Sequence, residues 1–111
     1  MPEPDATGAA RFDRCGDTLR LEFRLEQGRV REVRFQATGC GAVKAAGSAA
    51  TELLVGRSVE EARSLSAFEL NDHLGGVPPP KRHALWMVLE CVAEAVGPRT
   101  AAEPATTRAR P

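Results

Sequence analysis

A cysteine between two glycines has the surroundings in this chain that most favour chemistry. Cys40 stands in the stretch Gly39-Cys40-Gly41, where a strand pattern ends and a helix pattern begins. A thiol at the start of a helix lies at the positive end of the helix dipole, which favours the thiolate, the form that binds metals and acts as a nucleophile. Free cysteines are also common as buried packing residues. The stretch alone therefore leaves sulfur or metal chemistry and simple burial both open.

Three further side chains that could donate electron pairs to a metal stand where a predicted strand or helix begins. Cys15 and Asp17 open an alternating segment, and His83 stands near the start of the last helical pattern. Side chains two residues apart in an extended chain lie on the same side, so Cys15 and Asp17 should point the same way. With Cys40, these donors suit a tetrahedral zinc site, ferrous iron or part of an iron–sulfur cluster.

Each of these residues also has a plain structural interpretation. Asp17 suits a turn, His83 a surface position and Cys15 a buried one. Cys91 follows Ala84 by seven residues on the same helical pattern, which separates them by about 10 Å along the axis. Because metal ligands lie within about 2.3 Å of the ion, Cys91 should not share a site with His83. We expect it to be a packing residue.

Two strands must bring the donors together. Residues 19–26 alternate strictly between apolar and charged side chains, which is typical of a strand with one wet face. Gln27-Gly28 signals a turn, and a second strand carries Val33, Phe35 and Ala37 on one face. Val30 breaks that alternation and indicates a bulge. In such an antiparallel hairpin the start of the first strand lies beside the end of the second, so the donors of both strands gather at one end.

Helices follow the hairpin. The sequence predicts helices over 42–55 and 81–96, and capping boxes that begin with Ser58 and Ser66 predict two short helices between them. A short edge strand is expected over 9–13. We therefore predict an α+β fold, a small antiparallel sheet with helices packed on one face.

Composition narrows the classes of function. The chain has 111 residues, a length that predicts one domain, which we expect over 9–97. A flexible start (1–8) and a disordered tail (98–111) should flank it. The formal net charge of the chain is zero. A neutral chain gives no electrostatic case for nucleic acid or an acidic membrane, and no apolar run reaches membrane-spanning length. The acidic N-terminus lacks the apolar core of a signal peptide, which predicts a cytoplasmic protein.

The order of these motifs resembles the iron–sulfur cluster assembly scaffold family, the IscU-like proteins and the NifU amino-terminal domain. The resemblance extends over about residues 8–96. The matching segments are Cys15-Gly16-Asp17, Val33-Arg34-Phe35-Gln36-Ala37-Thr38-Gly39-Cys40-Gly41-Ala42, Ser48-Ala49-Ala50-Thr51-Glu52-Leu53, Gly56-Arg57-Ser58-Val59-Glu60-Glu61-Ala62 and Val77-Pro78-Pro79-Pro80-Lys81-Arg82-His83.

The resemblance implies a three-stranded antiparallel sheet with helices and a protein that is not an enzyme. It implies that a cysteine desulfurase delivers persulfide sulfur, that iron joins it to form a [2Fe–2S] cluster, and that the cluster passes to acceptor proteins. Zinc commonly occupies the same pocket. Cys15, Asp17, Cys40 and His83 match the site residues of the family. Pro78, Pro79, Pro80 and Lys81 resemble a Leu-Pro-Pro-Val-Lys segment that some members offer to an Hsp70-type chaperone.

One departure bears on function. Ala84 stands where the family usually has a third cysteine, which accepts persulfide or binds the cluster in several members. Ala84 therefore supports a degenerate paralogue acting as a metal-binding interaction module. A sulfur-transfer protein, in which Cys40 or Cys15 accepts persulfide and passes it on, is another alternative to a cluster scaffold. A cluster bridging two chains, in a homodimer, is also compatible with so few donors.

Overall fold

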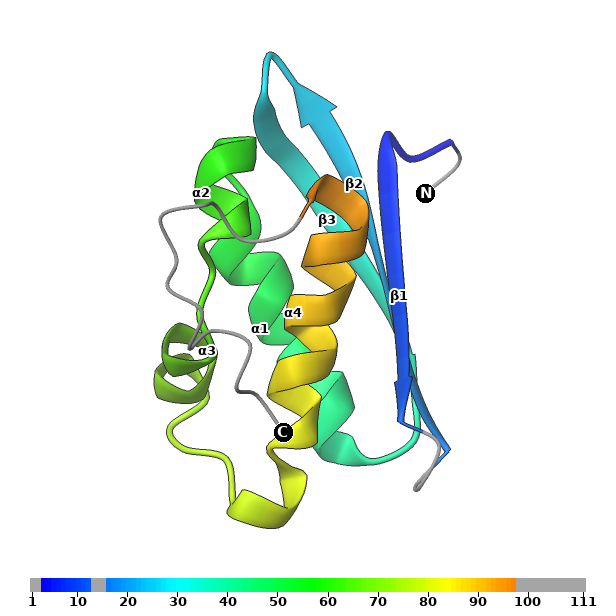
Figure 1. Cartoon of the computed structure of the whole chain (residues 1–111), viewed down its shortest axis with the longest axis vertical. Coiled ribbons are helices and arrows are strands. Elements are labelled where there is room, and N and C mark those ends of the chain that lie inside the picture. The colour runs from blue at the N-terminus through cyan, green and yellow to red at the C-terminus, as the bar shows by residue number, and fades with distance from the viewer. Residues whose placement is uncertain (1–2, 13–15, 98–111) are drawn as a thin grey trace.

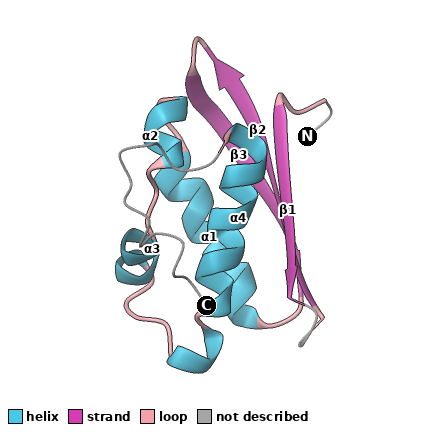
Figure 2. Cartoon of the chain, viewed as in Figure 1, coloured by secondary structure: helices cyan, strands magenta, loops and turns pink. Residues whose placement is uncertain are grey.

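The computed structural model describes residues 3–12 and 16–97. Three strands form an antiparallel sheet in the order β1-β2-β3, and the helices lie on one face of it (Figures 1 and 2). This arrangement confirms the predicted α+β fold. In chain order the elements are β1 (Ala6–Phe12), β2 (Asp17–Glu26), β3 (Arg29–Thr38), α1 (Gly41–Leu54), α2 (Val59–Arg63), α3 (Ala67–His73), a short 3-10 helix (Pro79–Lys81) and α4 (His83–Val96).

The β2–β3 hairpin has the predicted turn and bulge. Gln27 and Gly28 both have positive φ angles, 52° and 76°, which is the conformation of a two-residue type I′ turn. The register shifts after Arg24, so that Leu25 lies opposite Val30, as the broken alternation predicted. At the far end of the hairpin Thr18 lies opposite Thr38, and the start of β2 is therefore beside the end of β3.

The hydrophobic core lies between the sheet and the two long helices, α1 and α4, which cross the same face of it (Figure 1). Small residues let α1 approach closely. A Cβ atom added to Gly47 would lie 2.7 Å from the ring of Phe35, too close for any larger residue there without movement of the ring. From β2 the core contains Leu19, Leu21 and Phe23, and from α4 it contains Leu85, Val88, Cys91 and Val92.

Three elements have bounds that differ from the predictions. β1 begins at Ala6 rather than Ala9, because residues 6–8 pair with β2. α1 covers Gly41–Leu54, one residue earlier at each end than predicted. α4 begins at His83 rather than Lys81. Residues 79–81 form a separate 3-10 turn instead, because two consecutive prolines lack N–H groups. The predicted tail over 98–111 lies outside the described residues.

The two short helices begin with the predicted capping boxes. The side chains of Ser58 and Ser66 each accept a hydrogen bond from the backbone N–H three residues on. The carboxylates of Glu61 and Glu69 in turn accept one from the backbone N–H of the cap serine. None of the helices in the described part of the chain is long and apolar enough to cross a membrane.

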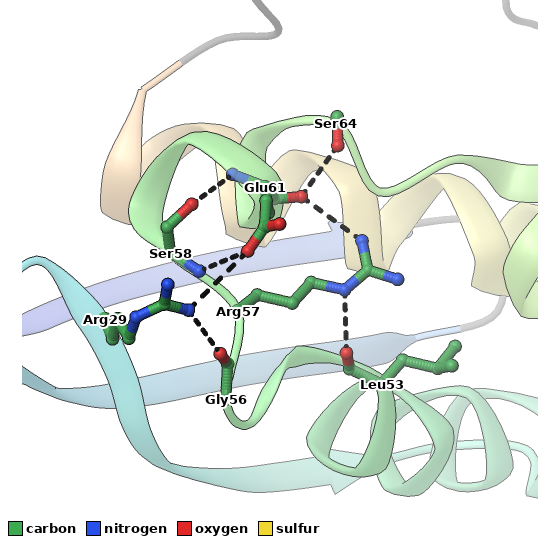
Figure 3. Close-up of polar contacts among 7 residues, drawn as sticks. All are labelled: Arg29, Leu53, Gly56, Arg57, Ser58, Glu61 and Ser64. Carbon is green, nitrogen blue, oxygen red and sulfur yellow. Dashed lines mark hydrogen bonds and ion pairs between the residues drawn. The ribbon is translucent and has the colours of Figure 1, made fainter.

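Arg57 ties three helices together at the opposite end of the sheet from the donor residues. Its guanidinium donates to the backbone carbonyls of Leu53, in α1, and Glu61, in α2 (Figure 3), and to the Glu69 carboxylate of α3 at 2.6 Å. Its own carbonyl accepts from the N–H of Val30, so the α1–α2 linker also pairs with β3. One side chain therefore holds the short helices in place.

Replacing Arg57 by alanine should lower the free energy of unfolding by about 2 kcal/mol, because three hydrogen bonds to carbonyl and carboxylate groups are lost. Denaturant unfolding monitored by circular dichroism measures the change. Arg57→Lys should fall between wild type and alanine, since an ammonium group lacks the planar fork. Arg31→Ala removes an exposed arginine with a single ion pair and should cost less than about 0.5 kcal/mol. An equal loss in the Arg31 and Arg57 variants would contradict this role.

Candidate metal centre

Asp17, Cys40 and His83 converge at one end of the sheet. One donor atom of each lies within 4.8 Å of the other two. Asp17 is the first residue of β2, Cys40 is the N-cap of α1 directly after β3, and His83 is the first residue of α4. The hairpin register brings the first two together, and the packing of α4 on the sheet adds the third.

The Asp17 carboxylate is the centre of this group. Its side chain is only 1% exposed, yet both oxygens have partners. Oδ1 accepts from the backbone N–H of Cys40 at 3.0 Å, and Oδ2 lies 2.8 Å from His83 Nε2 and 3.5 Å from Cys40 Sγ. A buried carboxylate with these contacts is held in one orientation.

Gly39 makes room for that carboxylate. A Cβ atom at residue 39 would lie 1.9 Å from Asp17 Oδ1, and the φ angle of 112° is one that other residues rarely adopt. A Cβ at Gly41, on the other side of Cys40, would meet nothing within 4 Å. The two glycines of the motif therefore have different roles, and only Gly39 is required by the site.

Phe12 positions the imidazole. Its ring stacks on that of His83, with the centroids 4.2 Å apart and the planes 17° from parallel. Stacking limits rotation of the His83 ring and covers one face of it. Sequence reasoning missed both Phe12 and the specific role of Gly39. Nothing in the local pattern around Phe12 indicates a contact with a residue 71 positions away.

The electrostatics of the site favour negative charge. α1 and α4 both begin here, and neither has an acidic residue in its first turn or a side-chain cap. Asp17 therefore lies near the positive ends of two helix dipoles, which stabilise its negative charge. The hydrogen bond from His83 holds the pKa of the Asp17 carboxyl below its usual value, and the bonds from Cys40 act in the same direction while burial opposes them.

This lowered pKa predicts a loss of stability in acid. The carboxyl has its ordinary pKa in the unfolded chain, so its contribution is complete above that value and is lost as the pH falls through it toward the lower folded pKa. The free energy of unfolding of the wild type should therefore fall more steeply below about pH 5 than that of Asp17→Asn. Denaturant unfolding at a series of pH values measures both. Parallel pH profiles of the two proteins would contradict the prediction.

The three donors fit a metal ion. Ligand distances of 2.0–2.3 Å in a tetrahedral site put donor atoms about 3.3–3.8 Å from one another. The separations of 2.8 and 3.5 Å around Asp17 Oδ2 lie near this range, so small side-chain movements would suffice. A thiol, an imidazole and a carboxylate are also a donor set that zinc and iron both accept.

The other predicted residues fall into three groups. Cys15 lies outside the described residues. Pro78, Pro79, Pro80 and Lys81 are exposed and lead directly to His83. Cys91 is a buried packing residue, as predicted: its Sγ lies 3.5 Å from the carbonyl of Leu19, and burial raises its pKa to about 12. Ala84, next to His83, is buried and offers no donor.

Comparison with known proteins identifies the family. The model of the NifU-like N-terminal domain matches residues 2–102. The nitrogen fixation protein NifU of Cereibacter sphaeroides is 41% identical over 106 residues, which are 91% of this chain and 43% of that protein. The chain thus spans less than half the length of that relative. The iron–sulfur cluster assembly scaffold protein IscU of Azotobacter vinelandii is 34% identical over 85% of this chain and 74% of its own length.

The fold has a solved counterpart. The crystal structure of FiSufU from Fervidobacterium islandicum AW-1 matches with a TM-score of 0.65 over 86% of this chain and 83% of that one, at 12% sequence identity. At this identity the likeness concerns the fold alone. The family match covers nearly the whole sequence and includes every donor residue of the candidate centre. The chain therefore belongs to the NifU-like N-terminal domain family.

Proposed function

We propose that this chain is an iron–sulfur cluster assembly scaffold that holds iron or a [2Fe–2S] cluster as cargo at Asp17, Cys40 and His83. The observation that carries the proposal is the convergence of a carboxylate, a thiol and an imidazole within 4.8 Å of one another. Relatives of the same family are named as iron–sulfur cluster assembly scaffold proteins. Cys15, two residues before Asp17, is the fourth ligand in this proposal, on sequence grounds.

The residues have distinct parts in the proposed site. Cys40 supplies a thiolate at the helix start, and His83 supplies an imidazole whose ring is held by Phe12. Asp17 keeps both near the place that the cargo would occupy, through its bonds to the backbone of Cys40 and to His83. Zinc fits the same donors. Nothing in this role requires turnover of a substrate, so we propose a carrier rather than an enzyme.

The partners follow from the cargo. A cysteine desulfurase would supply sulfur, and acceptor proteins would take the finished cluster. The exposed segment Pro78–Lys81 precedes His83 in the chain, and its last three residues form a short 3-10 helix. It is the segment we propose for an Hsp70-type chaperone. The cytoplasmic location and the homodimer remain predictions.

Persulfide transfer without cluster assembly is the second candidate function. The observation in its favour is the Cys40 thiol, which stands at the start of α1. Of the two cysteines that the structure describes, Cys40 is partly exposed and Cys91 is buried. Cys40 would then be the acceptor. Mass spectrometry after incubation with a cysteine desulfurase would find a persulfide on wild type and none on Cys40→Ser.

Metal content and anaerobic reconstitution test the scaffold proposal. Wild type purified at neutral pH should contain iron or zinc, and reconstitution with iron, sulfide and a desulfurase should give visible charge-transfer absorption. Cys40→Ser should lose both. Cys91→Ala is the matched control, because it removes a thiol outside the centre, and it should keep both. Stoichiometric zinc with no visible absorption would overturn cluster assembly and leave a metal-binding module.

A further inference from the structure

The sheet has two edges, and they are covered to different extents. In the order β1-β2-β3, the edge strands are β1 and β3 (Figure 2). On β1 the N–H of Ala9 donates to the Glu94 carboxylate of α4 at 2.8 Å. On β3 the backbone of Val30 bonds to Gly56 and Arg57 in the α1–α2 linker. Such covers matter because the free edge of a strand is a template for pairing with another chain.

The second half of β3 has no such cover. In an antiparallel sheet the backbone groups of successive residues point alternately to one side of the strand and to the other. Ala9 points away from β2, so its partner Arg20 bonds to β3, where Gln36 bonds back to β2. The N–H and C=O groups that point out of the sheet therefore belong to Val33, Phe35 and Ala37. No described residue forms a hydrogen bond with these outward groups.

This uncovered segment, residues 33–38, has few of the features that keep edge strands from pairing. It contains no proline, and the bulge of the hairpin lies outside it. Its one charged side chain, Arg34, pairs with Glu32 at 3.0 Å. The side chain of Phe35 packs against the core but is still partly exposed. A further strand beside β3 would bury it more completely.

The uncovered segment is complementary to a second copy of itself. In an antiparallel pair with Phe35 opposite Phe35 of the second copy, Val33 lies opposite Ala37, and all the outward backbone groups find partners. Arg34 then lies opposite Gln36. A register shifted toward the turn would instead place the two Arg34 side chains opposite each other. A shift in the other direction would leave Val33 without a partner in β3, so one register is favoured.

We infer that two copies of this chain pair antiparallel through residues 33–38, so that their three-stranded sheets join into one. An antiparallel pair of identical strands has two-fold symmetry and closes after two copies, so it gives a dimer and not a fibre. The partner at this edge is thus a second copy of the same chain. The inference goes beyond the proposed function and does not depend on bound metal.

The α1 helices of the two copies would meet at a normal packing distance. A Cβ atom at Gly47 would lie 2.7 Å from the ring of Phe35 and 3.1 Å from Leu19, so α1 lies over β3 and β2. Because neighbouring strands are about 4.8 Å apart, two helices placed in this way on either side of the β3–β3 pair have axes about 10 Å apart. Packed helices lie about 8–10 Å apart.

Opposite charges on α1 fit the same two-fold axis. Lys44, Ser48 and Glu52 are exposed and four residues apart, so they form one stripe along the helix. Since Gly47 lies over Phe35, the axis passes near Ser48, and Lys44 of each copy lies level with Glu52 of the other. The small Ser48 side chain in the middle permits close approach. Lys44 forms no ion pair with a described residue, so its ammonium group is available to the second copy.

The pairing keeps the two metal centres apart. Thr38, the last residue of β3, lies opposite Glu32 of the other copy, so the two Thr38 residues are about 20 Å apart along the strands. Cys40 follows Thr38 by two residues and lies beyond the paired segment. Each copy therefore keeps its own centre at its own end of the joined sheet, and a dimer of this kind does not share a cluster between chains.

Sedimentation velocity of the full chain over a concentration series tests the inference. Wild type should pass from monomer to dimer between about 10 μM and 1 mM, as expected for a small interface. Lys44→Glu should weaken dimerisation about tenfold, because the symmetry places two carboxylates together at each of two contacts. Combining Lys44→Glu with Glu52→Lys should restore it to within about twofold, although the exposed ion pair of Glu52 with His73 is lost.

Hydrogen exchange measured by nuclear magnetic resonance at low and high concentration locates the contact. The amides of Val33, Phe35 and Ala37 should exchange at least about fivefold more slowly where the dimer forms. The amides of Arg34 and Gln36 bond to β2 already in the monomer, so their exchange should change less.

Glu90→Lys is the matched control for the charge changes, because it reverses one exposed charge on α4. It should leave dimerisation unchanged. The inference is wrong if wild type stays monomeric up to about 1 mM. It is also wrong if the Lys44 and Glu90 changes act equally, if the combined swap fails to restore the dimer, or if exchange at the outward amides is unaffected. Dimerisation should survive Cys40→Ser, with metal content measured on the same sample. Loss of the dimer together with the metal would show that a shared metal, and not β3, joins the copies.

Discussion

Replacing Gly39 by alanine is expected to lower the free energy of unfolding by about 3 kcal/mol and metal affinity at least tenfold. The added Cβ would lie 1.9 Å from Asp17 Oδ1, and the φ angle of 112° is strained for alanine. The carboxylate must then leave its place, and its hydrogen bonds to the Cys40 backbone and to His83 are lost or lengthened. Denaturant unfolding and metal titration of the same preparation measure the two effects.

Gly41→Ala is the matched control on the other side of Cys40. A Cβ there meets nothing within 4 Å, and Gly41 is the first residue of α1. Alanine favours helix more than glycine does, so stability should be unchanged or should rise by up to about 1 kcal/mol. If Gly39→Ala and Gly41→Ala behave alike in both measurements, the role assigned to Gly39 is wrong.

Replacing Gly8 by alanine is expected to cost about 2–3 kcal/mol through overpacking. A Cβ at this residue of β1 would lie 1.9 Å from the backbone carbonyl oxygen of Cys91. A backbone atom cannot rotate away as a side chain can, so β1 and α4 must separate. The separation also strains the bond that the next N–H, of Ala9, donates to Glu94 at 2.8 Å. Thermal or denaturant unfolding measures the loss.

Ala9→Ser serves as the control for Gly8. It changes the neighbouring residue of the same strand, which is exposed on the outer face, and should alter stability by less than about 0.5 kcal/mol. Because Gly8 touches α4 and not the metal ligands, the fraction of Gly8→Ala that remains folded should bind metal normally. Loss of metal affinity in that folded fraction would contradict the claim that Gly8 affects only the packing of β1 on α4 and not the metal centre.

Much of the fold could be predicted because it depends on local chemistry. The alternation of residues 19–26, the Gln27-Gly28 turn and the serine capping boxes each involve residues within a few positions of one another. Strand pairing by a short turn then fixes which ends meet. The meeting of Asp17 with Cys40 followed from this reasoning, because a hairpin register has few alternatives once the apolar face is known.

Helix starts were harder to predict than helix existence. The apolar stripe of the last helix located it correctly, yet the pattern placed its start at Lys81 instead of His83. The prolines decided the boundary by closing a separate 3-10 turn. The predicted start of β1 was three residues too late, also because of contacts that the local pattern does not show. Pairing with β2 supplies backbone partners to residues 6–8, whose composition alone predicts no strand.

The sequence by itself identified the candidate donor residues, the hairpin that joins Asp17 and Cys40, and the separation of Cys91 from His83. Only the tertiary structure decided that Asp17 is buried between Cys40 and His83 and that Phe12 stacks on the imidazole. It also decided that a Cβ atom has room at Gly41 but not at Gly39. These facts depend on contacts between residues 22 to 71 positions apart. Local propensity carries no information about such contacts, because they arise from the packing of α4 and the turn after β3 against the sheet.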